Sequence, residues 1–380
     1  MNTVRNKLRA KGTSVVTEEQ VRQALRDVLD PEIGRPIEDI GMLESITIDG
    51  GRVEVHVLLT IEGCPLKDRI TTDVTAAVQP LDGVDRVDVR LTPMSQQQRE
   101  GLVSTLRGGA PTSQQKIQFP DSTSVIAVAS GKGGVGKSSV TVNLAAAMAA
   151  EGKKVGVLDA DVWGFSVPRM LGVAGKPVGF ENMILPLEGY GVKVISMGFF
   201  VPEDTPVIWR GPMLHKAIEQ FLGDVYWGDL DFLLCDLPPG TGDVSISLAS
   251  FLPGASMLVV TTPQEAARTV AERAGKMAER TNLRPIGVVE NMSWFVCPHC
   301  GEHETIFGSG GGQEAANHLD VPLMAQVPLM PAMREGGDTG SPIVISHPDS
   351  PAGVALREAA AAVARATKSK VGRPLSLLTT

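Results

Sequence analysis

One glycine-rich stretch constrains the fold of this chain more than any other feature of the sequence. Residues 131–139 read GKGGVGKSS and fit the pattern G-x-x-x-x-G-K-[ST] of a phosphate-binding loop. The loop stands between an apolar run, SVIAVAS, and a helix-forming run, SSVTVNLAAAMAAEG, as the pattern requires. In such a strand–loop–helix unit, backbone N–H groups and the positive end of the helix bind phosphate oxygens. The sequence therefore predicts a nucleotide site at the end of a buried strand.

The sequence from Ser122 onward alternates short apolar runs with helical runs, which is typical of a parallel sheet joined by helical crossovers. The helical runs include MLHKAIEQFLG and PQEAARTVAERAGKMAERT. We therefore predict an α/β domain over residues 122–367, an open and mostly parallel P-loop NTPase sheet with helices on both faces. The runs expected to form its strands are SVIAVAS, KKVGVLDA, DFLLCDL, ASMLVVTT, RPIGVVEN and VPLMAQV.

A small α+β domain is expected ahead of this sheet, over residues 16–93. Thr17 and Gln20 have the spacing of a capping box, and apolar residues recur after them with helical periodicity. Two alternating runs, LESITIDGG and RVEVHVLLT, predict a hairpin, and a helical run and one more strand complete an αββαβ order. Residues 94–121 are expected to be a linker, in which the run MSQQQREGLVSTL is a helix candidate. Residues 1–15 and 368–380 are expected to be a flexible arm and tail.

Charge, hydropathy and cysteine content argue against several classes of protein. The 380 residues carry a net charge of −8, whereas a protein that binds nucleic acid through charge needs a basic face. No apolar run approaches the ~20 residues of a membrane span, and the basic start has no apolar signal-peptide core. The four cysteines are too scattered for a disulfide scaffold, so their thiols are expected to be reduced. We therefore expect a cytoplasmic protein without nucleic-acid or membrane partners.

The phosphate-binding loop supplies the first set of predicted site residues. Lys137 is expected to contact the β- and γ-phosphates of ATP, and Ser138 to bind Mg²⁺. Lys132 directly follows the first glycine, where a cation can reach the nucleotide of a facing subunit. A solvated loop lysine is the alternative interpretation of Lys132. The predicted ATP- and Mg²⁺-binding residues of the loop are Gly131, Lys132, Gly133, Gly134, Val135, Gly136, Lys137, Ser138 and Ser139.

Three carboxylates at the ends of predicted strands form a second set. Asp159 and Asp161 follow the run KKVGVL, and Asp236 follows FLLC. Because parallel strands end at one edge of a sheet, these side chains are expected near the phosphates, with Asp236 reaching Mg²⁺ through water. Each carboxylate alone could instead cap the helix that follows it. The loop 238–242 is expected to respond to the γ-phosphate.

A pair of cysteines near the end of the domain has the spacing of metal ligands. Cys297 and Cys300 stand in the stretch SWFVCPHCGEHETIFG, with His299 and His303 close by. Zinc or iron–sulfur ligation is compatible with two thiolates. No second cysteine pair follows. The ligand set is therefore either local, with His303 and His299 completing a zinc site, or shared with another subunit.

Four stretches together closely resemble the Mrp/ApbC family of iron–sulfur cluster carrier ATPases, which are related to the ParA/MinD proteins. They are SGKGGVGKSS, LDADVWGFSVP, DLPPGTGD and VVENMSWFVCPHC. The first domain, with LLTIEGCPL, resembles the small iron–sulfur assembly domain often fused ahead of that ATPase. The resemblance implies an ATPase that binds a [4Fe–4S] cluster across a homodimer. It also implies delivery of the cluster to apoproteins, with cluster-assembly scaffolds as further partners.

The resemblance also implies roles for individual residues. Lys132 matches the lysine thought to act on the partner subunit's nucleotide, and Asn291 the asparagine that recognises adenine. Asp161 matches the carboxylate that positions the attacking water. The predicted catalytic residues are therefore Lys132, Lys137, Asp161 and Asp236, and Asp159 is assigned to Mg²⁺ and ATP binding.

The cysteine pair has a counterpart in the same family. Cys297 and Cys300 match the pair that holds the bridging cluster together with the same pair from a second subunit. Two-fold symmetry makes half a site per subunit sufficient. Cys64 is a further candidate for metal or cluster contact, because the related small domain carries a functional cysteine there.

A partitioning or positioning ATPase of the ParA/MinD type, with a structural zinc at the cysteine pair, is the main alternative. It would use the same Lys132, Lys137, Asp161 and Asp236. It should also carry a basic face for DNA or a strongly amphipathic terminal helix for membranes, and the sequence predicts neither. A scaffold that does not hydrolyse ATP is a second alternative, against which the presence of Asp161 and Asp236 argues.

Overall fold

The computed structural model describes residues 16–31, 33–60, 66–106, 119–120, 122–162, 164–181, 183–200, 211–240, 243–264, 267–297 and 299–367. These residues form two compact units. One unit combines Met1–Gln114 with Gly179–Leu185, and the other combines Gln115–Val178 with Pro186–Thr380. The arm and tail predicted at residues 1–15 and 368–380 lie outside the described residues.

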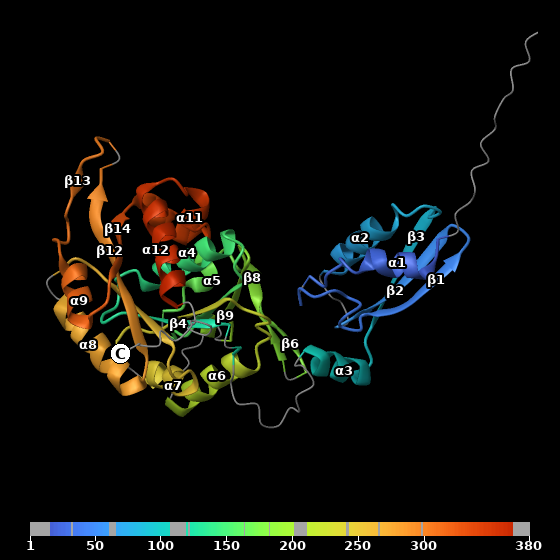
Figure 1. The fold of residues 1–380 in the computed structure, drawn as a ribbon, viewed down its shortest axis with the longest axis horizontal. Helices are drawn as coiled ribbons and strands as arrows, with labels where there is room; N and C mark the ends of the chain where they lie inside the picture. The colour runs from blue at the N-terminus through green and yellow to red at the C-terminus, as the bar shows by residue number, and fades with distance from the viewer. Residues whose placement is uncertain are drawn as a thin grey trace, which may run out of the picture. The chain divides into compact units, whose positions relative to one another are not determined.

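The first unit has the predicted αββαβ order (Figure 1). Its three-stranded sheet has the order β1-β2-β3, in which β1 and β2 are antiparallel and β2 and β3 are parallel. The predicted capping box at Thr17 and Gln20 is confirmed at the start of the first helix. The elements are α1 Glu18–Leu25, β1 Leu43–Asp49, β2 Arg52–Leu59, α2 Lys67–Val78 and β3 Arg86–Pro93.

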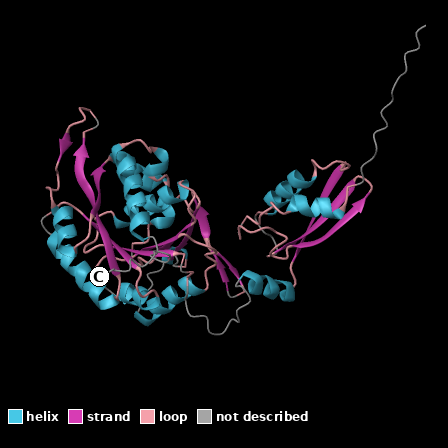
Figure 2. Cartoon of the chain, viewed as in Figure 1, coloured by secondary structure: helices cyan, strands magenta, loops and turns pink. Residues whose placement is uncertain are grey.

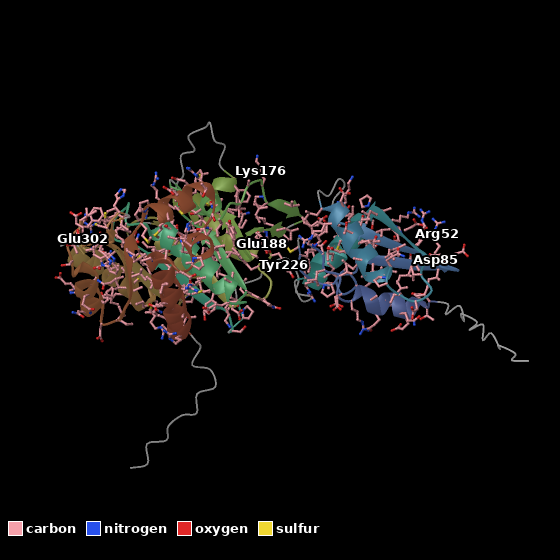
Figure 3. All side chains as sticks on the ribbon, turned by 90° about the horizontal axis from the view of Figure 1, so that it is seen from above. Arg52, Asp85, Lys176, Glu188, Tyr226 and Glu302 are labelled. Carbon is pink, nitrogen blue, oxygen red and sulfur yellow. The ribbon has the colours of Figure 1, made fainter. Side chains whose placement is uncertain are left out.

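The turn between β1 and β2 depends on two glycines. Gly50 has φ +59°, a left-handed conformation that side chains with a Cβ rarely adopt. At Gly51 a Cβ would collide with the carboxylate of Asp85, whose side chain is labelled in Figure 3. The N–H of Asp85 donates to the Gly51 carbonyl at 2.7 Å, which ties the turn to the start of β3.

A further helix, α3 Gln96–Leu106, lies within the range predicted as linker and buries Leu102 and Val103. A two-stranded sheet pairs β6 Val178–Phe180 with β7 Met183–Leu185. Arg99 of α3 lies 3.5 Å from the Glu181 carboxylate in the turn of that sheet. The first unit therefore gains a segment from far along the chain, which the sequence did not indicate.

The second unit is built on a nine-stranded sheet, drawn in magenta in Figure 2. Its order is β13-β12-β11-β4-β10-β5-β9-β8, with β14 paired to β12. All its pairings are parallel except β8 with β9 and β12 with β13, which confirms the predicted mostly parallel sheet. The strands are β4 Ser124–Ala129, β5 Val155–Asp159, β8 Leu187–Gly189, β9 Val192–Ser196, β10 Phe232–Asp236, β11 Ser256–Thr261, β12 Arg284–Val296, β13 His303–Glu304 and β14 Leu323–Leu329.

Helices cover both faces of this sheet, as predicted (Figure 1). One face carries α4 Lys137–Ala150, α5 Val167–Met170, α11 Ile343–Ser346 and α12 Pro351–Thr367. The opposite face carries α6 Gly211–Gly223, α7 Asp243–Phe251, α8 Ala267–Thr281 and α9 Gly311–Leu319. The remaining helices are α10 Pro331–Thr339 and the 3₁₀ turn Met197–Phe199.

Three of the central strands, β5, β10 and β11, are buried along their whole length because helices cover the sheet on both sides. Every residue of β5, β10 and β11 is buried, which explains their continuous apolar runs. The core joins these strands to α4 and α12 through aliphatic and alanine side chains. Among the described residues, no helix has both the length and the apolar character needed to cross a membrane.

Candidate functional site

The phosphate-binding loop connects β4 to α4. Gly134 and Gly136 have φ of +77° and +80°, so both positions favour glycine. Gly136 is the N-cap of α4, whose first turn presents backbone N–H groups without a partner further back in the helix. Loop and helix start therefore provide the backbone cradle that a phosphate requires.

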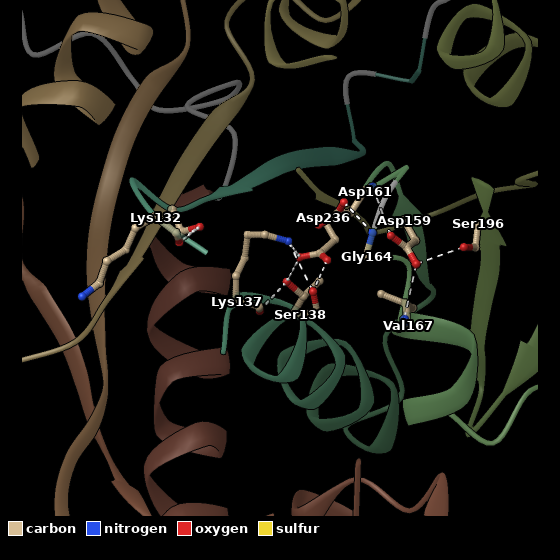
Figure 4. Close-up of polar contacts among 11 residues, drawn as sticks. Lys132, Lys137, Ser138, Asp159, Asp161, Gly164, Val167, Ser196 and Asp236 are labelled. Carbon is tan, nitrogen blue, oxygen red and sulfur yellow. Dashed lines mark hydrogen bonds and ion pairs between the residues drawn. The ribbon is translucent and has the colours of Figure 1, made fainter. Parts of the chain in front are cut away.

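Lys137 and Asp236 form a buried ion pair at this loop (Figure 4), with 2.7 Å between Nζ and Oδ1. Ser138 Oγ donates to Asp236 Oδ2 at 2.5 Å, and Thr141 Oγ1 donates to Oδ1 at 2.8 Å. Both Asp236 oxygens are thus satisfied by the start of α4. Removing one partner of a buried pair leaves an uncompensated charge, so this network holds α4 against β10.

Asp159 is directly opposite Asp236 in the register of β5 and β10. Its carboxylate accepts hydrogen bonds from Ser196 Oγ at 2.9 Å, Val167 N–H at 3.3 Å and Asp161 N–H at 3.2 Å (Figure 4). Complete burial, and then the nearby charge of Asp236, raise the pKa of Asp159 from 3.8 to about 7. Asp159 therefore anchors both ends of the loop that carries Asp161.

Asp159→Asn is expected to change how the stability of the nucleotide-free protein depends on pH. Because the pKa is higher in the folded than in the unfolded chain, the stability that Asp159 contributes is full below pH about 4 and is lost as the pH rises through about 7. The loss amounts to at most about 4 kcal/mol, at about 1.4 kcal/mol for each pH unit. Urea unfolding should show that the free energy of unfolding of the variant rises relative to that of the wild type between about pH 5 and pH 8.

Asp229→Asn, an exposed position in the same unit, is the control for the loss of one carboxylate. The stability difference between this variant and the wild type is the reference for the pH-dependent difference expected of Asp159→Asn. A free-energy difference between Asp159→Asn and the wild type that stays constant with pH would contradict the burial argument.

Lys132 points away from Lys137 and Asp236 (Figure 4). Its Nζ donates to the side-chain carbonyl of Gln264, in the loop after β11. Arg273 of α8 donates to the Gly131 carbonyl at 3.3 Å, next to this lysine in the chain. The two lysines of the loop therefore point in different directions and have different partners, Gln264 for Lys132 and Asp236 for Lys137. The sequence predicted different roles for them.

Asn291 lies in the middle of β12 and is buried against the phosphate-binding loop. Its Nδ2 donates to the Val135 carbonyl at 2.9 Å, and its side chain fills the space that a Cβ on Gly136 would occupy. The amide predicted to recognise adenine thus lies at the loop that is predicted to bind the phosphates.

The cysteine pair begins where β12 ends. The N–H groups of Cys300 and then His299, followed by the Cys300 thiol, lower the pKa of the Cys297 thiol. The Gly301 N–H donates to the Cys297 carbonyl at 2.9 Å, which closes a tight turn. Cys300 is exposed, and its Sγ lies 3.8 Å from Glu302, which is labelled in Figure 3. The turn therefore favours the thiolate form of Cys297, the form that binds metal.

The histidines near this pair do not complete a metal site in the described part of the chain. The His303 ring stacks on Trp294, with ring centroids 5.7 Å apart and planes at 22°. No group of three or more His, Cys, Asp or Glu side chains that could hold a metal occurs among the described residues. The donor set is two thiolates, which suit an iron–sulfur cluster or zinc.

The other cysteines differ in surroundings. Cys235 is fully buried in β10, and desolvation raises the pKa of its thiol, so it is a packing residue. Cys64 lies outside the described residues, and so do Thr241 and Gly242 of the loop predicted to sense the γ-phosphate.

Three residues of the site, Thr141, Ser196 and Gln264, were not among the predicted site residues. Thr141 follows Lys137 by one helical turn, a spacing that would have indicated it. Ser196 ends β9, a strand that was not predicted, and Gln264 belongs to a loop without a recognisable pattern.

Two families of known proteins match this chain. The one described as NUBPL iron-transfer P-loop NTPase, of the ParA group, matches residues 121–364. The one described as iron–sulfur cluster assembly protein matches residues 18–89. Together they cover both units of the fold.

Several curated relatives are similar over most of their length. A protein of Mycobacterium tuberculosis named iron–sulfur cluster carrier protein is 53% identical over 367 residues, which are 94% of this chain and 96% of that protein. A protein of the same name from Bacillus subtilis is 40% identical over 83% of this chain and 89% of its own.

Two solved structures resemble the second unit. A nucleotide-binding protein from Archaeoglobus fulgidus, solved with ADP and with cobalt found in it, is 38% identical with a TM-score of 0.53, over 61% of this chain and 91% of that chain. The septum site-determining protein MinD from Pyrococcus horikoshii, solved with Mg-ADP, is 25% identical with a TM-score of 0.50, over 66% of this chain and 100% of that chain.

Proposed function

Because the chain belongs to the family of NUBPL-type iron-transfer P-loop NTPases, we propose that it is an ATP-dependent iron–sulfur cluster carrier. It binds a [4Fe–4S] cluster between the Cys297–Cys300 pairs of two subunits and transfers it to apoproteins. Its partners are a second copy of itself, apo client proteins and the scaffold that supplies the cluster. It works in the cytoplasm, without nucleic acid or membrane.

The observation that carries this proposal is the isolated cysteine pair at the end of β12. Cys297 has a lowered thiol pKa, Cys300 is exposed, and no third donor gathers beside them in the described residues. A two-fold axis near the pair would bring four thiolates together, the number that a [4Fe–4S] cluster takes. A cluster shared in this way is released when the two subunits move apart.

The nucleotide site supplies the means to move the subunits. Lys137 and the loop N–H groups bind the phosphates, Ser138 would hold Mg²⁺, and Asp236 would reach it through water. Asp161 orients the attacking water, in a loop that Asp159 anchors at both ends through hydrogen bonds from the Asp161 and Val167 N–H groups. Mg²⁺ would neutralise charge on the phosphates. Hydrolysis is proposed to be slow and to change how the subunits pack.

Anaerobic reconstitution of the full chain with iron and sulfide tests the proposal. A broad absorption band near the visible–ultraviolet boundary and about four irons per dimer are expected. Transfer is then followed as activation of an apo [4Fe–4S] enzyme. A colourless protein with tightly bound zinc would instead favour the positioning ATPase with a structural metal.

A further inference from the structure

One strand, β12, runs past the nucleotide loop and ends at the cysteine pair. It extends without interruption from Arg284 to Val296, and Cys297 follows directly (Figure 1). Asn291, in its middle, contacts the loop through Val135. The residue that contacts the nucleotide loop and the first cysteine are therefore joined by a short piece of a single strand.

The Asn291 end of this connection is tightly packed. Asn291 is buried, and a Cβ on Gly136 would overlap its side chain. The next residue, Met292, has φ +59°, and the pairing of β12 with β14 shifts register between Asn291 and Phe295. The strand thus bends immediately after it contacts the loop. Because the side chains at this contact are closely packed, a displacement of the loop is expected to displace the strand as well.

Glu290, the preceding residue, is on the other face of the strand because successive strand residues alternate. It is 1% exposed, and Oε2 accepts from the Gly312 N–H at 2.5 Å. Its Oε1 accepts from Gln326 Nε2 of β14 at 2.7 Å. This buried carboxylate was not among the predicted site residues, although it directly precedes Asn291.

Gly312 belongs to the first turn of α9, the first helix after the cysteine pair. A Cβ at Gly312 would lie 2.5 Å from the Glu290 Cβ, so the helix start fits against the strand only with glycine there. The segment from Cys297 to Gly310 therefore leaves β12 after Val296, and the helix start that follows it returns to the strand at Glu290, next to Asn291. The segment is therefore tied to β12 at both ends, to Val296 by the chain itself and to Glu290 through Gly312.

We propose that Glu290 and Asn291 are positioning residues that link the nucleotide loop to the cysteine segment, so that bound nucleotide changes the exposure of Cys297 and Cys300. Asn291 receives the change at the loop, and Glu290 passes it to the start of α9 through Gly312. The inference deepens the proposed function and rests on it, since it explains how ATP changes the hold on a cluster.

Thiol labelling of the cluster-free full chain tests this link without any metal. Iodoacetamide labelling of Cys297 and Cys300, each resolved by peptide mass spectrometry, is timed with and without a saturating non-hydrolysable ATP analogue. In the wild type we expect the rate to change by about fivefold or more, the usual lower range of coupling between sites. Glu290→Gln should bring that ratio close to one.

Two measurements separate a link from a purely structural role. The nucleotide affinity of Glu290→Gln should stay within about twofold of the wild type, because Glu290 faces away from the loop. Glu314→Gln is the matched control: it removes a carboxylate from the same first turn of α9, and among the described residues the Glu314 side chain forms no hydrogen bond or ion pair with β12. It should keep the wild-type ratio. Gly312→Ala tests the same contact from the helix side, because a Cβ there would overlap the Glu290 side chain.

Three results would overturn the link. They are a wild-type ratio of one, a wild-type ratio retained in both Glu290→Gln and Gly312→Ala, and equal losses in Glu290→Gln and Glu314→Gln. None of these depends on cluster binding. Failure to reconstitute a cluster would contradict the proposed carrier function. The labelling result would still show whether bound nucleotide changes the exposure of Cys297 and Cys300.

Discussion

Cys297→Ser is expected to abolish cluster binding and to leave ATP binding unchanged. A serine hydroxyl is a hard, protonated group that cannot replace a thiolate on iron, and the loss is doubled because the proposed site takes the residue from both subunits. After reconstitution, the absorption band should be absent and iron should fall from about four per dimer to the background level. ATP affinity, measured by calorimetry, should stay within about twofold because the thiol contacts no residue of the phosphate loop.

Two further variants serve as controls for the cysteine experiment. Cys235→Ala removes one thiol from the core of β10 and should keep the full iron content. His303→Ala removes the histidine that stacks on Trp294 and should also keep the cluster. Loss of metal in His303→Ala with retention in Cys297→Ser would reverse the assignment and indicate a local zinc site.

Lys132→Ala is expected to reduce ATP hydrolysis by about 10³-fold, as loss of a cation that acts in trans does in related phosphoryl transfer. ATP binding should be nearly unchanged, because we expect Lys137 and the loop N–H groups to hold the phosphates, whereas Lys132 Nζ is directed toward Gln264. Steady-state hydrolysis and nucleotide affinity measured on the same samples check both parts. Lys176→Ala, on the surface of the same unit, is the control for the loss of a lysine.

Mixing of two inactive variants tests whether Lys132 acts across the dimer. A dimer of one Lys132→Ala subunit and one Asp161→Asn subunit contains one complete site if the lysine comes from the partner, and none if it acts within its own subunit. Random mixing should then restore about a quarter of the wild-type rate, since half of the dimers have one of two sites intact. An inactive mixture would place the role of Lys132 within a single subunit.

The outline of both units was predictable from local patterns. Apolar runs separated by helical runs required a parallel sheet, and the G-x-x-x-x-G-K-S pattern placed the loop at the end of one strand. Asp159 and Asp236 were expected to meet because parallel strands end at the same edge, and they are register partners in β5 and β10. Two strands, β8 and β9, were not predicted, and β8 has only three residues and lies at the sheet edge.

Contacts between distant segments could not be predicted in the same way. Ser196 lies 37 residues from Asp159, and Lys132 lies 132 residues from Gln264, so no local pattern pairs them. Glu290 was passed over because a single carboxylate in a strand has no signature. Its hydrogen bonds to α9 and β14 exist only once those elements pack on β12.

The sequence by itself determined the chemistry that the chain can offer: phosphate-binding N–H groups, two lysines, three strand-end carboxylates and two thiols. These groups can be recognised from residue type and from short spacings along the chain, because local backbone geometry determines where residues a few positions apart lie. Only the tertiary structure decided which of these groups meet. It stacked His303 on Trp294 instead of gathering it with the cysteines, and it set Asn291 on the loop with Glu290 behind it. Packing makes such choices because each buried polar group must find a partner wherever the fold provides one.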